Sequence, residues 1–187
     1  MIKKWVALLC ALMMVFALAA CGEKNDEDQT SGDKKDDAVS QVDSMTAAEE
    51  AFSKAFEADK AYDIDAMASV EYTVNFGADI DKDAVVKTAN DAKAALDEEE
   101  LEEYKEGLKD LKYHILEKTT LSADELSARI AELAEKFRDT DKITEIIKLK
   151  YTIDSDTLAD AQVEKDVEMI CVDGAWYCYM GDELWNQ

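Results

Sequence analysis

The sequence predicts an α+β domain in which N-terminal helices pack on one face of a curved antiparallel sheet of about four strands. Apolar residues recur at helical spacing in the first half of the chain, whereas they alternate with polar residues in the second half. Helices followed by a meander of strands are typical of α+β domains, in which one sheet face is covered and the other is wet. The 187-residue chain has no proline and only six glycines, which argues against a loop-rich scaffold.

The first twenty residues have the pattern of an export signal, because two lysines precede an apolar run. This run is shorter than the roughly 20 apolar residues that a membrane-spanning helix needs. Leu18, Ala19 and Ala20 stand directly before Cys21. The segment resembles a bacterial lipoprotein signal, in which a peptidase recognises these small residues, cuts before the cysteine and leaves that cysteine to carry the lipid. The resemblance implies a protein anchored through Cys21 on the outer, extracytoplasmic face of the cell membrane.

Three segments are therefore predicted: residues 1–20 as the signal peptide, residues 21–44 as the lipidated cysteine and a disordered acidic tether, and residues 45–187 as a single α+β domain. The tether has almost no apolar residues, so burial cannot offset the entropy lost on ordering. Order is predicted to begin at Thr46, because Thr46-Ala47-Ala48-Glu49 matches a capping box.

Helical spacing extends from the predicted cap to Tyr62, where Phe52, Ala55 and Phe56 share one side of an amphipathic helix. A short helix is expected through residues 64–68. The next residues, 70–76, alternate and fit either a helix or a strand. Two further helices are predicted over residues 81–95 and 97–111; in the second, a narrow apolar stripe lies among acids.

The second half begins with alternation at Leu111, Tyr113 and Ile115, which predicts a strand. Ser122 then opens a capping box with Glu125, which predicts the start of a helix. The apolar side chains of this helix follow the spacing i, i+4, i+7 and i+11, as a buried face requires. They are Leu126, Ile130, Leu133 and Phe137.

Two alternating segments, residues 143–153 and 162–171, predict the next strands. Ile143, Ile147 and Leu149 share the apolar side of the first. Its lysine side is expected to meet the acidic side of its antiparallel neighbour, which disfavours a one-residue slip in register. Asp173-Gly174 is a strong hairpin signal and predicts a turn into a final strand.

The predicted hairpin fixes the neighbours of the two C-terminal cysteines. A two-residue turn pairs Cys171 with Trp176 and Met169 with Cys178. The cysteines are then diagonal neighbours about 7–8 Å apart. A disulfide needs Cβ atoms about 4 Å apart, so two free thiols are predicted.

Several motifs between Lys112 and Cys178 carry a family resemblance: an opening strand, Leu121-Ser122-Ala123-Asp124-Glu125-Leu126, Lys142-Ile143-Thr144-Glu145, and Val172-Asp173-Gly174-Ala175-Trp176-Tyr177. This half of the chain resembles a group of uncharacterised exported lipoproteins of Gram-positive bacteria. Ala175 stands where that family usually has lysine. The resemblance implies a cystatin-like or NTF2-like cone and supplies no catalytic residue.

The charge of the chain restricts its partners. Acids outnumber bases 44 to 21, which gives a net charge of −23. Such a field repels phosphate backbones, and no local cluster of Lys and Arg offsets it, so nucleic acid is not an expected partner. The expected partners are the membrane, through the Cys21 lipid, and an unidentified protein or small-molecule ligand. No cofactor is expected.

One acidic motif resembles the start of a calcium-binding loop. Asp79, Asp81 and Asp83 alternate as in an EF-hand. However, Ala84 stands where the loop needs glycine, and Asn90 replaces the closing glutamate. These carboxylates are therefore only weak metal candidates, and a solvated helix N-terminus is the favoured explanation, since acids there suit the helix dipole.

The favoured function is a non-enzymatic binding domain. Its candidate ligand-facing residues are Trp176, Tyr179 and Trp185, although alternation along a strand prevents all of these aromatic residues from sharing one pocket. The main alternative is an NTF2-like enzyme that uses His114, the only histidine, together with a buried acid. A third possibility is an accessory solute-binding lipoprotein, but the chain is short for the usual two lobes. A polar pocket holding His114 and a carboxylate would favour the enzyme, and a filled core would favour the binding domain.

Overall fold

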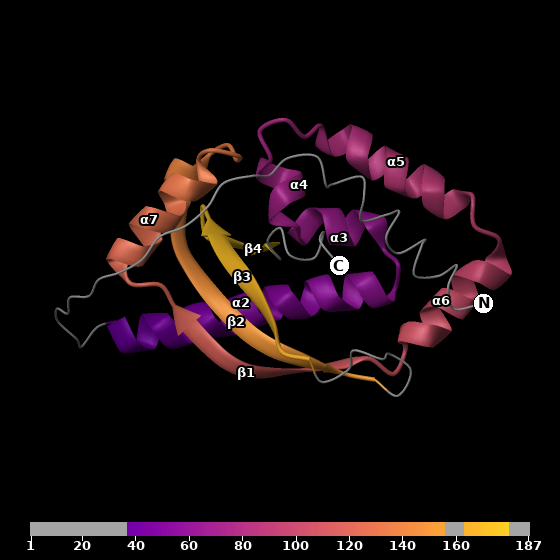
Figure 1. The fold of residues 1–187 in the computed structure, drawn as a ribbon, viewed down its shortest axis with the longest axis horizontal. Coiled ribbons are helices and arrows are strands. Elements are labelled where there is room, and N and C mark those ends of the chain that lie inside the picture. Colours follow the sequence, from indigo (N-terminus) through magenta and orange to yellow (C-terminus); the bar gives the residue numbers. More distant parts are fainter. Residues whose placement is uncertain (1–36, 156–162, 180–187) are drawn as a thin grey trace.

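The computed structural model describes residues 37–155 and 163–179 and confirms an α+β fold with a four-stranded antiparallel sheet (Figure 1). The helices before the sheet are α2 (Asp37–Lys60), α3 (Ile64–Val70), α4 (Tyr72–Phe76), α5 (Lys82–Ala94) and α6 (Glu98–Leu108). The remaining elements are β1 (Lys112–Thr120), α7 (Ala123–Leu133), the 3-10 turn η1 (Thr140–Lys142), β2 (Ile143–Asp154), β3 (Lys165–Val172) and β4 (Ala175–Tyr179). Among the residues described, no helix is both long and apolar enough to cross a bilayer.

The strands form a meander in the order β1-β2-β3-β4, and their pairing confirms the predicted register. Lys148 lies opposite Glu168, and Lys150 lies opposite Asp166. The lysine side of β2 therefore faces the acidic side of β3. This match of opposite charges favours the observed register over a slip by one residue.

The hairpin between β3 and β4 also has its predicted geometry. Cys171 pairs with Trp176, and Met169 pairs with Cys178. Asp173 and Gly174 both have positive φ, 51° and 81°, as a type I′ turn requires. Both cysteines are buried and free.

Gly174 is expected to matter for stability because its φ of +81° is costly for a residue with a Cβ atom. Gly174→Ala should lower the free energy of unfolding by about 1 kcal/mol. Gly107 in α6 is the matched control, since a Cβ there meets no atom within 4 Å. Gly107→Ala should raise the same free energy by up to about 1 kcal/mol. Urea denaturation measures both, and equal effects of the two substitutions would contradict the turn assignment.

The sheet buries one face and only part of the other, so the prediction of one wet face holds for the part that carries Lys148 and is wrong where helices cover the second face. One face packs on α2 through a core centred on Phe52, Leu149 and Met169. At one end of the other face, α4 and α7 cover a second core that includes Ile146 and Ile170 (Figure 1). A register shift between residues 143 and 145 of β2 places Ile143 in this second core, away from Ile147 and Leu149.

Helix α2 starts earlier than the sequence predicts. It begins at Asp37, so residues 37–44, predicted as part of the tether, are helical. Thr46 lies inside the helix, where its hydroxyl donates to the Val42 carbonyl at 2.9 Å, and the predicted cap at this residue is wrong. No proline or glycine interrupts residues 37–60, and Ala48 is fully buried against the sheet.

Residues 70–76, which fit a helix or a strand by sequence, are helical. They form the end of α3 and the whole of α4, which are separated by Glu71. Tyr72 and Val74 are buried, and Tyr72 stacks on Phe76 at 4.9 Å between ring centroids. Tyr72 and Phe76 lie four residues apart on one side of this short helix and Val74 lies nearly opposite, so the alternation reflects a helix that is buried on more than one side. The predicted helices near 81–95 and 97–111 are confirmed as α5 and α6.

Candidate functional site

Several predicted functional residues lie outside the described part of the chain. These are the signal-peptide residues Leu18, Ala19 and Ala20, the lipidation residue Cys21, and Trp185. The first thirty-six residues, and with them most of the predicted tether, lie outside it too. Anchoring through Cys21 therefore remains a prediction from the sequence.

The aromatic residues predicted to face a ligand separate to the two faces of the sheet. Tyr179 is only 6% exposed and packs against the rings of Tyr72 and Phe137 in the second core. Trp176 is half-buried and packs on the first core, beneath α2. Tyr179 is a core residue, and the two side chains share no ligand-facing surface.

The acidic residues of the weak calcium motif lie on the surface at the start of α5. Asp79, Asp81 and Asp83 are all exposed. Asp81 caps α5, because its carboxylate accepts a hydrogen bond from the Ala84 amide at 3.1 Å. In the described ranges, no three His, Cys, Asp or Glu side chains are grouped so that they could hold a metal ion.

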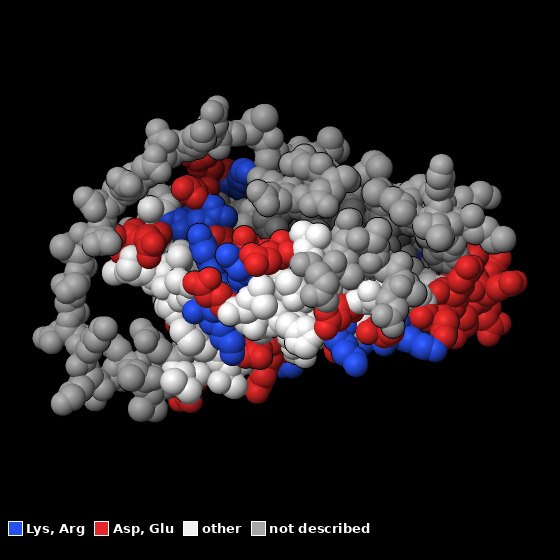
Figure 2. Space-filling view, turned by 60° about the horizontal axis from the view of Figure 1, so that its bottom comes forward, with Lys and Arg blue, Asp and Glu red and all other residues white. Residues whose placement is uncertain are grey.

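The surface charge is unevenly distributed. Figure 2 shows acidic side chains gathered at the α6 end of the molecule, whereas acidic and basic side chains interleave over the part that contains α7 and the strands. Glu98, Glu99 and Glu103 are exposed acids on α6. The α6 end is thus a solvated acidic surface, and the mixed-charge surface lies beside α7.

His114 lies on the exposed surface of β1 and contacts one carboxylate. Its Nε2 is 2.6 Å from Asp154 Oδ2 at the end of β2, and 60% of its side chain is exposed. The strand pairing explains the contact, since Lys112 lies opposite Asp154 and His114 lies two pairs further along, on the same face of the sheet as Asp154's partner. The structure therefore brings together a histidine and an acid, but both are accessible to solvent.

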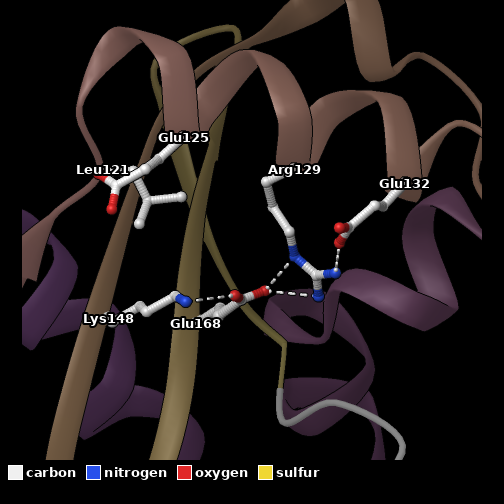
Figure 3. A pocket seen from close by; sticks show the side chains of 6 residues that line it. All are labelled: Leu121, Glu125, Arg129, Glu132, Lys148 and Glu168. Atoms are coloured by element: carbon white, nitrogen blue, oxygen red, sulfur yellow. Dashed lines mark hydrogen bonds and ion pairs between the residues drawn. The ribbon is translucent and has the colours of Figure 1, made fainter. Parts of the chain in front are cut away.

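A polar hollow of about 390 Å³ lies between α7 and the sheet (Figure 3). Its lining combines one apolar side chain with charges of both signs. The lining residues are Leu121, Glu125, Arg129, Glu132, Lys148 and Glu168. Helix α7 supplies three of these charged groups, and β2 and β3 supply the other two.

An ion pair between Arg129 and Glu168 closes one side of the hollow. Arg129 Nε and Nη2 donate to Glu168 Oε2 at 3.0 and 2.9 Å, while Nη1 donates to Glu132 Oε2 at 2.6 Å. The side chains of Arg129 and Glu168 are only 26% and 16% exposed. Burial opposes the charge of Arg129, but the Glu168 carboxylate beside it raises the pKa of Arg129 above its ordinary value. Arg129 therefore stays charged, and its hydrogen bonds to Glu168 hold α7 on β3.

The other side of the hollow has a weaker interaction and a fixed carboxylate. Lys148 Nζ lies 3.8 Å from Glu168 Oε1, and 54% of the lysine side chain is exposed. Glu125 Oε2 accepts hydrogen bonds from the amide and the hydroxyl of Ser122, at 2.8 and 2.6 Å. Hydrogen bonding to Ser122 lowers the pKa of Glu125, so this carboxylate is ionised at neutral pH.

Sequence reasoning missed this hollow because its residues come from three elements. A signal was nevertheless present, since Arg129 is one of only two arginines in the chain. It also lies directly beside Ile130 in the apolar stripe of α7, where a long charged side chain can reach across the helix edge toward the sheet. Lys148 and Glu168 belong to the lysine side of β2 and the acidic side of β3, which the alternation predicts. Alternation along the strands does not show that α7 lies over these two residues.

A second perturbed group, Glu71, lies between α3 and α4 beside Cys178 of β4. Burial raises the pKa of Glu71 to about 7, although hydrogen bonding with Thr73 opposes the shift. Burial also raises the pKa of the Cys178 thiol well above its ordinary value, with Glu71 contributing in the same direction. Cys178 therefore remains an unreactive core thiol.

Glu71 is expected to make stability depend on pH. The unfolded chain loses its Glu71 proton near pH 4.5, whereas the folded chain keeps it to about pH 7. The folded state thus binds more protons in this window, so the free energy of unfolding should fall as pH rises from 4.5 to about 7. Glu71→Gln should remove the part of this decrease in the free energy of unfolding that comes from Glu71. Urea denaturation of both proteins at about pH 5 and about pH 7.5 measures the difference, and identical pH profiles would contradict the assignment.

Comparison of the chain with models of protein families, with curated protein sequences and with solved structures found no match. The six lining residues of the hollow include no histidine, cysteine or serine, and their charged groups suit binding by ion pairs and hydrogen bonds.

Proposed function

We propose that this protein is an extracytoplasmic lipoprotein, anchored to the outer face of the cell membrane through Cys21, whose α+β domain binds a ligand or partner at the α7 hollow. In this proposal the domain is non-enzymatic. The cystatin-like or NTF2-like assignment is part of the proposal, and a long helix, α2, packed across a four-stranded antiparallel meander supports it.

One observation carries the anchoring part of the proposal. Leu18-Ala19-Ala20-Cys21 follows a short apolar run and precedes a polar, acidic segment. An apolar run of this length fits a cleaved signal better than a membrane-spanning helix. Lipid attached to the new N-terminal cysteine gives stable anchoring when two acyl chains are present.

The anchoring test expresses the full-length chain in a Gram-positive host supplied with an alkyne-labelled fatty acid. The wild-type protein is expected to carry the label, to sediment with membranes and to be digested by protease added to intact protoplasts. Cys21→Ser should lose the label and leave the membrane. Cys10→Ser is the matched control, because Cys10 lies within the apolar run and should not change labelling. Full labelling of Cys21→Ser, or unlabelled wild-type protein, would overturn the proposal.

The second candidate function is an enzyme centred on His114, and the 2.6 Å contact with Asp154 favours it. A carboxylate that orients a histidine is a common arrangement in general acid–base catalysis. Any turnover that depends on this pair should fall by about 10²-fold or more in His114→Gln. Under the binding function, ligand affinity should be the same in His114→Gln as in the wild type.

A further inference from the structure

The Glu168 carboxylate uses its two oxygens unequally. Oε2 accepts both hydrogen bonds from Arg129. Oε1 accepts no hydrogen bond from the residues that the structure describes and faces the Lys148 ammonium at 3.8 Å, beyond hydrogen-bond distance. This oxygen therefore has unused acceptor capacity at the floor of the hollow.

A second carboxylate faces the same space from the opposite element. Glu125 projects from the first turn of α7, and its Oε2 is fixed by Ser122. Figure 3 shows the amino group of Lys148 pointing along the floor toward Glu168, with the Glu125 carboxylate above it. An ammonium group placed here can interact with two carboxylates that belong to different elements.

The net charge of the hollow favours a positively charged ligand. Three carboxylates and two cations line it, which leaves an excess of one negative charge, and the whole chain carries −23. This field attracts cations and repels anions. Arg129 and Lys148 place two positive charges among these carboxylates, which disfavours a hard metal ion that needs a shell of oxygen ligands. A hydrogen-bonding cation fits better, and Leu121 offers an apolar contact for an alkyl stem.

We infer that the hollow binds a protonated primary amine on an alkyl chain, with the ammonium donating to Glu168 Oε1 and pairing with Glu125, and that Lys148 holds this position as an internal competitor in the unliganded protein. The inference names the ligand class for the site of the proposed function and rests on that function. A free diamine and a lysine side chain of a partner protein present the same chemistry.

The experiment titrates the full-length protein in neutral detergent with 1,5-diaminopentane in one arm and with N-acetyl-lysine amide in the other. The Nε–H resonance of Arg129 is the readout, because it reports on Glu168 and the chain has only two arginines. We expect it to shift with saturating dependence on amine concentration. Tighter binding of the diamine indicates a small-molecule ligand, and tighter binding of the lysine derivative indicates a partner lysine.

Substitution of Lys148, the internal competitor for the amine, is the sharpest test. Lys148→Met keeps the length of the side chain, leaves the Arg129–Glu168 pair intact and should tighten amine binding about three- to fivefold. Lys142→Met is the matched control, since Lys142 is also an ion-paired lysine with 45% of its side chain exposed, and it should leave the affinity unchanged. Glu168→Gln should weaken binding at least about tenfold.

Two results would overturn the inference. One is that the Arg129 Nε–H resonance shows no saturable shift in either the wild type or Lys148→Met at amine concentrations up to about 10 mM. A specific site, even a weak one with a dissociation constant of about 1 mM, would be largely filled at that concentration. The other is equal tightening by Lys142→Met, which would indicate a nonspecific response to net charge. Neither result affects the fatty-acid labelling of Cys21, so the proposal of an amine site and the proposal of a lipid anchor are tested separately.

Discussion

Phe52→Ala is expected to lower the free energy of unfolding by about 3–5 kcal/mol. Phe52 is 2% exposed and lies at the centre of the core between α2 and the sheet. Its ring centroid is 4.9 Å from that of Tyr113 on β1 and 4.8 Å from that of Tyr151 on β2. The substitution removes these aromatic contacts and leaves a cavity that the surrounding strands cannot close.

Urea denaturation followed by far-ultraviolet circular dichroism measures this loss, because m-values and midpoints together give the free energy. Val42→Ala is the control within the same helix, since Val42 is 63% exposed. It should change the free energy by no more than about 0.5 kcal/mol. A Phe52→Ala effect as small as that of Val42→Ala would mean that α2 is not packed on the sheet as described.

The features that sequence predicts correctly are those set by neighbouring residues. Asp173-Gly174 specifies a turn with positive φ, and that turn then fixes the pairing of Cys171 with Trp176. Ser122 and Glu125 form both hydrogen bonds of the predicted capping box at the start of α7. In each case the information lies within a few residues, so the local chemistry leaves few alternatives.

The features that sequence misses depend on contacts between distant residues. The packing of α2 on the sheet is one such contact, and the local cap pattern at Thr46 does not mark the start of a helix that begins at Asp37. The second core depends on the register shift near Ile143, which period-two alternation cannot reveal. The hollow needs α7 to be placed over Lys148 and Glu168, which its own periodicity does not specify.

Breaking the Arg129–Glu168 pair is expected to destabilise the fold by about 2–4 kcal/mol, because either single substitution leaves a largely buried charged group without its main partner. Arg129→Met removes the donors of two hydrogen bonds to Glu168 Oε2 and one to Glu132. Glu168→Gln removes the charge that neutralises Arg129. The double variant should lose less than the sum of the single variants, with a coupling energy of about 1–3 kcal/mol.

The exposed pair Lys87–Asp91 in α5 provides the control cycle, since its side chains are 75% and 67% exposed. Its coupling energy should not exceed about 0.5 kcal/mol and should shrink further in salt. The Arg129–Glu168 coupling should persist at about 0.5 M salt, because solvent reaches the pair poorly. If both couplings were equally small, the ion pair would not be what holds α7 over β3, and the hollow would lack the fixed wall on which amine binding at Glu168 depends.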